Sequence, residues 1–201
     1  MTPPQAGPSP KGSSGRRRLV VLAGPTAVGK GSVSAWIREN SPDVWLSVSV
    51  TTRPARPGEI DGVHYHFVDD DTFDAMVAGS EFLEWAVVHR AFRYGTPRAP
   101  VEEALAADRP ALLEIDLQGA RQVRDQMPEA LFVFLRPPSW DEMVRRLVGR
   151  GTEDQAERDL RLETARSELT AEDEFDVTIV NDEVRSAAQQ LVALLRSGGP
   201  A

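Results

Sequence analysis

The 201-residue sequence contains no cysteine, which excludes a disulfide framework, a cysteine-ligated zinc site and thiol chemistry. Apolar runs are short as well: the longest, 19–23 and 131–135, fall far below the ~20 residues of a membrane span. A chain of this length still buries roughly 70% of its unfolded surface, so it can form a core of its own. We therefore expect a cytoplasmic protein without an integral membrane segment.

Charge is unevenly distributed along the chain. With 23 basic and 31 acidic residues the net charge is −8, yet residues 1–18 contain four basic residues and no acid. The remaining residues therefore carry a charge of −12, which argues against a general nucleic-acid binder. Because residues 1–18 are rich in Pro, Gly and Ser, we predict a disordered basic tail there; a docking role for this tail is the alternative.

Short apolar runs alternate with helical patterns over most of the chain. The predicted strands are 19–23, 111–116, 131–135 and 177–180, and the predicted helices are 98–107, 119–127, 139–149, 153–169 and 184–196. Continuous apolar runs are typical of strands covered on both faces, so the pattern predicts an α/β core with a parallel sheet. Residues 45–97 are rich in Ser, Thr, Arg and aromatic residues, with short alternating pieces, and predict a small β insertion.

A glycine-rich segment, residues 24–30, fits the pattern G-x-x-x-x-G-K between a predicted strand and a predicted helix. The backbone N–H groups of such a loop, together with the helix N-terminus, bind a polyphosphate, and Lys30 would reach its terminal phosphates. Gly31 stands where Ser or Thr normally ligates Mg²⁺, and the hydroxyl comes one residue later at Ser32. The metal would then be held mainly by phosphate oxygens and water. A plain glycine-rich turn is the alternative.

Residues 47–67 read SVSVTTRPARPGEIDGVHYHF, and here the chain resembles guanylate kinases. Further blocks follow in the order of that family: EFLEW at 81–85, YGTP at 94–97, EIDLQG at 114–119, PPS at 137–139 and GRGTE at 149–153. The resemblance spans residues 19–196 and is far more specific than a phosphate-binding loop alone.

The resemblance implies an α/β fold with a P-loop NTPase-type three-layer core, a small mixed β insertion for GMP and a helical lid. The implied division is a core of 19–44, 98–137 and 170–196, a GMP-binding region of 45–97, a lid of about 138–169, and tails of 1–18 and 197–201. The implied activity is ATP-dependent phosphorylation of GMP and dGMP to GDP, within purine nucleotide metabolism, with Mg²⁺ accompanying ATP.

Site residues follow from the same resemblance. For GMP they are Ser49, Arg53, Arg56, Tyr65, Glu84, Tyr94, Thr96 and Asp116. For ATP they are Gly24, Pro25, Thr26, Ala27, Val28, Gly29, Lys30, Gly31, Ser32 and Asn181. The residues expected to stabilise the transferred phosphoryl group are Lys30, Arg146, Arg150 and Arg161. No direct protein ligand to the metal is expected, although Glu114 and Asp116 could act through water.

These residue types suit the implied chemistry. Arg53 and Arg56 present fixed-charge forks to a monophosphate dianion, although a solvated loop is their alternative. Glu84 can accept from guanine N1–H and the 2-amino group together, a donor pair that adenine lacks. For Glu114 and Asp116, a buried structural role competes with ligand binding, and for Asn181 a turn at the strand end does.

Two other functions remain open from the sequence. One is a non-catalytic guanylate-kinase-like interaction module, which the intact glycine loop and Lys30 oppose. The other is a kinase for AMP or a pyrimidine nucleotide, which Glu84 opposes. We expect ATP and GMP as partners, no nucleic acid, no membrane, and a monomer or homodimer.

Overall fold

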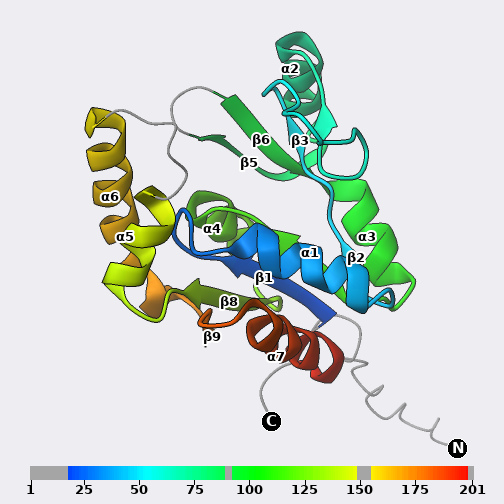
Figure 1. Cartoon of the computed structure of the whole chain (residues 1–201). Helices are drawn as coiled ribbons and strands as arrows, with labels where there is room; N and C mark the ends of the chain where they lie inside the picture. Colours follow the sequence, from blue (N-terminus) through cyan, green and yellow to red (C-terminus); the bar gives the residue numbers. More distant parts are fainter. Residues whose placement is uncertain (1–17, 89–91, 149–154, 199–201) are drawn as a thin grey trace, which may run out of the picture.

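The computed structural model of the chain describes residues 18–88, 92–148 and 155–198, with the side chains of 148 and 155–161 left out. Its core is a parallel sheet in the order β2-β7-β1-β8-β9 (Figure 1). The strands are β2 (Trp45–Leu46), β7 (Ala111–Glu114), β1 (Leu19–Ala23), β8 (Leu131–Arg136) and β9 (Val177–Val180). All five residues of β1 are buried, as their continuous apolar sequence predicts for a central strand.

Helices cover both faces of this sheet. On one face lie α1 (Lys30–Asn40) and α7 (Val184–Ser197), and on the other α3 (Arg98–Ala106) and α4 (Leu117–Gln126). Because side chains alternate along a strand, Val20 of β1 packs in one cluster with Ile37, whereas Val21 packs in the other with Val123. The predicted three-layer α/β class is therefore confirmed.

A smaller sheet lies above the core and has the order β4-β3-β6-β5 (Figure 1). Its strands are β3 (Val50–Thr51), β4 (His66–Phe67), β5 (Phe82–Val88) and β6 (Phe92–Pro97). The pairs β3–β6 and β5–β6 are antiparallel and β3–β4 is parallel, so this sheet is mixed, as predicted. The insertion begins later than residue 45, because Trp45 and Leu46 pair with β7 in the large sheet.

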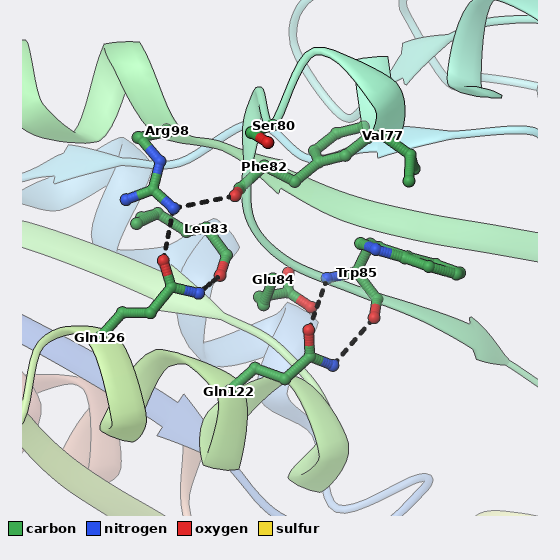
Figure 2. Close-up of a pocket in the computed structure, with 9 residues that line it drawn as sticks. All are labelled: Val77, Ser80, Phe82, Leu83, Glu84, Trp85, Arg98, Gln122 and Gln126. Atoms are coloured by element: carbon green, nitrogen blue, oxygen red, sulfur yellow. Dashed lines mark hydrogen bonds between the residues drawn. The ribbon is translucent and has the colours of Figure 1, made fainter. Parts of the chain in front are cut away.

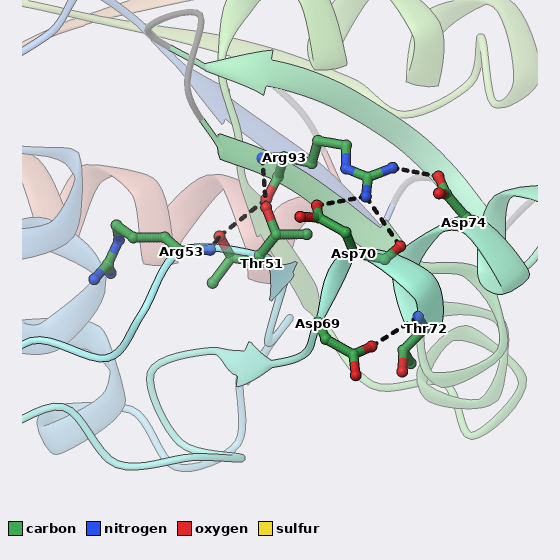
Figure 3. Close-up of polar contacts among 8 residues, drawn as sticks. Thr51, Arg53, Asp69, Asp70, Thr72, Asp74 and Arg93 are labelled. Atoms are coloured by element: carbon green, nitrogen blue, oxygen red, sulfur yellow. Dashed lines mark hydrogen bonds and ion pairs between the residues drawn. The ribbon is translucent and has the colours of Figure 1, made fainter.

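The small sheet also carries a helix, α2 (Asp70–Ala78), that was not predicted from the sequence. The Asp69 carboxylate caps it by accepting from the Thr72 N–H at 2.8 Å. The guanidinium of Arg93, on β6, contacts the carboxylates of Asp70 and Asp74 (Figure 3). These contacts fasten α2 to the sheet, whose own core includes the stacked rings of Phe73 and Phe82.

The expected lid contains two helices, α5 (Trp140–Val148) and α6 (Gln155–Leu169), followed by a short 3-10 turn, η2 (Glu172–Glu174). Helix α5 starts one residue after its predicted first residue, 139. The predicted start of α6 at 153 and the segment between the two predicted helices lie outside the described residues. Within the residues that the structure describes, no helix is long and apolar enough to cross a membrane.

The two expected tails lie mostly outside the described residues. Arg18, the last residue of the predicted N-terminal tail, is described, and its Nη1 donates to the Asp108 carbonyl at 2.6 Å. At the other end, Ser197 belongs to α7, and Gly198 ends that helix in a left-handed conformation. The ordered domain therefore includes at least Arg18, Ser197 and Gly198.

Candidate active site

The predicted phosphate-binding loop connects β1 to α1 at the carboxyl end of the sheet. Gly24 and Gly29 adopt φ values of 151° and 100°, a region that side chains disfavour. A Cβ on Gly24 would lie 2.2 Å from the Leu135 carbonyl oxygen, and one on Gly29 would lie 2.6 Å from Nδ2 of Asn181. Both glycines are therefore required for the loop to pack against β8 and the end of β9.

Lys30 is the first residue of α1 and turns back over the loop. Its Nζ donates to the carbonyl oxygens of Gly24 at 2.6 Å and Pro25 at 3.2 Å. Burial lowers the pKa of Lys30, and the charges of Glu114, Glu168 and Asp116 oppose that shift. The ammonium group is thus held at the mouth of the loop, among carboxylates.

One backbone amide of the loop already binds an anionic group. The Thr26 N–H donates to a carboxylate oxygen of Glu168, on α6, at 2.8 Å. A charge-assisted hydrogen bond of this kind shows that the amide is oriented to receive an anion. Sequence reasoning missed Glu168, because it stands inside a helix without a motif around it.

Arg53, the first of the two arginines predicted to bind a monophosphate, follows β3 and is buried. Its Nε donates to the Tyr94 hydroxyl at 3.0 Å and its Nη2 to the Glu59 carboxylate at 2.8 Å. Glu59 also accepts from the Arg56 N–H at 2.7 Å, while the Arg56 side chain is exposed. The Tyr65 ring lies 5.4 Å from the Arg53 guanidinium carbon, and burial raises the pKa of Tyr65 to about 12. Tyr65 therefore remains a hydroxyl donor at neutral pH.

Glu84, on β5, is a buried carboxylate that accepts a hydrogen bond from the neighbouring strand β6. The Thr96 hydroxyl donates to its Oε1 at 2.6 Å. Burial raises the pKa of Glu84 to about 7, the Thr96 hydrogen bond opposes the shift, and the Asp116 charge adds to it. Asp116 caps α4 by accepting from the Gly119 N–H at 2.7 Å. A carboxylate desolvated in this way is suited to a ligand that brings its own donors.

A single cleft of about 420 Å³ joins the loop to the small sheet. The predicted residues that line it are Thr26, Lys30, Ser49, Arg56, Tyr65, Glu84, Tyr94, Glu114 and Asp116. Thr164 and Glu168 of α6 line it as well and were not predicted. Arg53 and Thr96 do not line the cleft themselves, but each donates a hydrogen bond to a residue that does. Arg53 donates to Tyr94, and Thr96 donates to Glu84.

Arg146 and Asn181 lie behind the loop and are not among the residues lining this cleft. Arg146 donates to the carbonyl oxygens of Val28 at 3.3 Å and Asn181 at 3.1 Å, and its Nε donates to Glu142 at 3.0 Å. Asn181 is buried and its Nδ2 donates to the Val28 carbonyl at 2.8 Å. Both side chains therefore donate to the Val28 carbonyl and help to fix the backbone of the loop. Arg150 lies outside the described residues, and so does the side chain of Arg161.

The fold and the cleft define a nucleotide kinase of the P-loop class: a glycine loop with its lysine faces a pocket of arginine, tyrosine and carboxylate side chains. The sequence model of the family described as guanylate kinase matches residues 16–198. The chain is 65% identical over 180 residues to a guanylate kinase of Leifsonia xyli, covering 90% of this chain and 71% of that protein. It is 60% identical over 184 residues to one of Thermobifida fusca, covering 92% and 93%.

A solved structure agrees with these matches. The crystal structure of guanylate kinase from Anaplasma phagocytophilum superposes with a TM-score of 0.73 at 32% identity, covering 91% of this chain and 86% of that one. The chain belongs to the guanylate kinase family, which phosphorylates GMP to GDP with ATP. The predicted family, enzyme class and reaction are therefore confirmed.

Proposed function

We propose that the cleft holds both substrates at once, with GMP against the small sheet and the phosphates of ATP on the loop of residues 24–30. The observation that carries this proposal is the continuity of the cleft, in which Lys30 and Glu84 line one space of about 420 Å³. Phosphoryl transfer requires an in-line arrangement of donor and acceptor and the exclusion of water more than covalent chemistry by the protein. One shared cleft between two opposed binding regions supplies that arrangement.

Guanine recognition is assigned to Glu84, assisted by Ser49, Thr96 and Asp116. An ionised Glu84 accepts from N1–H and the 2-amino group of guanine, while Thr96 holds the carboxylate in place. Adenine offers no such pair of donors and would leave a buried charge unpaired. We therefore expect both GMP and dGMP to act as phosphoryl acceptors, because both carry guanine.

The acceptor phosphate is assigned to Arg53, Arg56, Tyr65 and Tyr94. Arg53 is already oriented, since its Nε contacts Tyr94 and its Nη2 contacts Glu59. A phosphate dianion placed there can take over the guanidinium hydrogen bond that Glu59 accepts from Arg53 Nη2. The attacking atom is an oxygen of this phosphate, which is already anionic, so the reaction needs no general base.

On the donor side, the backbone amides of the loop and the N-terminus of α1 bind the ATP phosphates. Lys30 lies at that N-terminus, where its ammonium group can leave the Gly24 and Pro25 carbonyls and contact the transferred phosphoryl group. Arg146 supports the loop from behind through the Val28 carbonyl. We assign Arg146, Arg150 and Arg161 to a lid that neutralises the phosphates when both nucleotides are bound.

The residues of the cleft fit Mg²⁺ bound together with ATP. Glu114 and Asp116 offer the hard oxygen atoms that this ion prefers, whereas Gly31 supplies no hydroxyl. Within the described residues, no cluster of three or more acidic or histidine side chains could hold a metal by itself. Glu114 and Asp116 would therefore hold the ion through water, beside Lys30. When bound, Mg²⁺ neutralises phosphate charge during transfer.

We also propose the functional division of the chain into a core, a GMP-binding region that ends at 97 and begins after Leu46 of the large sheet, and a lid of about 138–169. Two nucleotides reach the cleft only if these parts separate and close again, and α6 already touches the loop through Glu168. The location we propose is the cytoplasm, where ATP and GMP are available. A monomer is sufficient for this reaction, because one chain supplies both pockets.

An acceptor panel with a Lys30 variant tests this assignment. We expect coupled ADP release with GMP and dGMP, and little with AMP, UMP or CMP. Lys30→Met should lower kcat by about 10²–10³-fold, the usual effect of removing one preorganised electrostatic contact. Arg38→Met, which removes an exposed positive charge from the same helix, is the matched control and should leave kcat unchanged. Equal turnover with AMP, or full activity of a folded Lys30→Met enzyme, would refute the assignment.

A further inference from the structure

The edge of the small sheet that β5 forms is contacted by side chains of α4. β5 is the last strand in the order β4-β3-β6-β5, so one of its edges has no neighbouring strand. The unpaired backbone groups of such an edge need other partners. Figure 2 shows that Gln122 and Gln126, one turn apart on α4, reach this edge.

Gln122 acts as a substitute for a neighbouring strand. Its Oε1 accepts from the Trp85 N–H at 3.2 Å, and its Nε2 donates to the Trp85 carbonyl at 2.9 Å (Figure 2). One side-chain amide therefore satisfies both backbone groups of one β5 residue. The Trp85 side chain is 38% exposed and its ring meets the Phe73 ring edge-to-face, whereas Gln122 contacts only the Trp85 backbone.

Gln126 holds the residue on the other side of Glu84. Its Nε2 donates to the Leu83 carbonyl at 2.5 Å, and Arg98 contacts both its Oε1 and the Phe82 carbonyl (Figure 2). The pairing of β5 with β6 shifts register between Phe82 and Glu84, which is a β-bulge. Bulges redirect side chains and need local support. Here the support comes from α4 and the start of α3.

The bulged segment of β5 is buried on both sides. Phe82 packs in the core of the small sheet, and Leu83 packs in the core cluster that includes residues of α3 and α4. Glu84 lies against the N-terminal turn of α4, where a Cβ on Gly119 would lie only 2.5 Å from its Oε2. Gly119, Gln122 and Gln126 share one face of the helix. That face both leaves space for the carboxylate and anchors the backbone on each side of it.

We propose that Gln122 and Gln126 are positioning residues for base recognition: they hold the bulged segment of β5 so that the Glu84 carboxylate meets the guanine edge. This inference rests on the proposed role of Glu84. Neither glutamine lies in the nucleotide cleft, so both act through the strand. The helix capped by Asp116 thus tunes base recognition by a strand of the small sheet, to which it does not belong.

Discrimination between GMP and IMP provides the test, because IMP has N1–H but lacks the 2-amino group that Glu84 is assigned to read. Gln122→Met keeps the length of the side chain and removes both hydrogen bonds. We expect it to raise the KM for GMP about tenfold and to lower the ratio of kcat/KM for GMP over IMP by a similar factor. The KM for ATP should stay within about twofold. Gln126→Met should act in the same direction, and the double variant more strongly.

Gln190→Met is the matched control, since Gln190 is an exposed glutamine on α7, remote from β5. It should leave both KM values and the GMP:IMP ratio unchanged. A purely structural role for the glutamines would lower the melting temperature and leave that ratio intact. A ratio within twofold of wild type in folded Gln122→Met would overturn the proposal. If Gln122→Met does not fold, Gln126→Met, whose side chain is exposed, decides by the same criterion.

Glu84→Gln separates this inference from the function on which it rests. If Glu84→Gln keeps the wild-type GMP:IMP ratio, the assignment of Glu84 itself fails. If Glu84→Gln loses the ratio while both glutamine variants keep it, Glu84 reads the base and only the positioning role is rejected.

Discussion

Replacing Glu84 by glutamine should make the ligand-free enzyme more stable and much less active. The carboxylate is 5% exposed, and the Thr96 hydroxyl is the donor that the structure shows on its Oε1. Glutamine has nearly the same shape and can still accept that hydrogen bond through its own oxygen. The substitution therefore removes a buried charge while leaving the packing of β5 in place.

The size of the stabilisation follows from the pKa of Glu84. Burial raises this pKa from 4.5 to about 7. Between those values the folded enzyme keeps a proton that the unfolded chain has released, so the free energy of unfolding falls as the pH rises through this window. The loss amounts to about 3 kcal/mol at pH 8, because one pKa unit corresponds to about 1.4 kcal/mol. Glutamine does not titrate and avoids this loss.

Thermal unfolding without nucleotide measures the effect. At pH 8 we expect a melting temperature about 6–12 °C higher for Glu84→Gln than for wild type, at about 2–4 °C for each kcal/mol in a chain of this size. At pH 5 most of this difference should disappear, since wild-type Glu84 is then protonated. Glu81→Gln, an exposed glutamate just before β5, is the control and should shift neither curve.

Glu84→Gln should lower catalytic efficiency with GMP, although it raises the melting temperature. The glutamine amide presents a donor where guanine also has donors, so kcat/KM for GMP should fall by at least about 100-fold, the equivalent of one or two hydrogen bonds to a charged acceptor. The wild-type KM for GMP should rise as the pH falls below 7, and this step should be missing from the variant. Equal melting-temperature differences at pH 5 and pH 8, or GMP kinetics within tenfold of wild type, would refute the reasoning.

Two further substitutions test neighbouring contacts. Gly119→Ala places a methyl group 2.5 Å from Oε2 of Glu84, so the carboxylate must move, and steady-state kinetics should show a KM for GMP about tenfold higher with an unchanged KM for ATP. An unchanged KM for GMP would mean that Glu84 relaxes without leaving the base. Glu168→Gln weakens the hydrogen bond from the Thr26 N–H, so ATP phosphates compete with a neutral group and the KM for ATP should fall severalfold. A higher KM for ATP would show that the carboxylate assists nucleotide binding.

The core could be predicted from the sequence because its signals are local. The run 19–23 matches β1 residue for residue, since a central strand buried on both faces is apolar throughout. The run 177–180 also matches β9, although β9 is the edge strand and only Ile179 in it is fully buried. The loop of residues 24–30 was equally predictable from the sequence, because its glycines are needed for backbone conformations that other residues disfavour.

Features that depend on contacts between distant segments were not predictable in this way. α2 was missed because its neighbours read as short strands, although Asp69 and Thr72 form an N-cap in the structure. Gln122 lies 37 residues from Trp85 in sequence, and nothing in the local pattern indicates that its amide replaces a β-strand. Glu168 lies 142 residues from Thr26. Polar side chains on a helix have solvent as their ordinary surroundings, so such roles emerge only from the fold.

An acidic chain that binds two polyanions needs cationic groups that are already oriented, and carboxylates of the chain itself contribute to that orientation. Glu59 binds the Arg53 guanidinium, Glu168 accepts from the loop amide of Thr26, and Lys30 lies among acidic residues. Each substrate phosphate must then exchange with a carboxylate instead of occupying a bare positive site. We therefore expect a nucleotide, which gains binding from the base and the phosphate together, to displace these carboxylates more readily than free phosphate does.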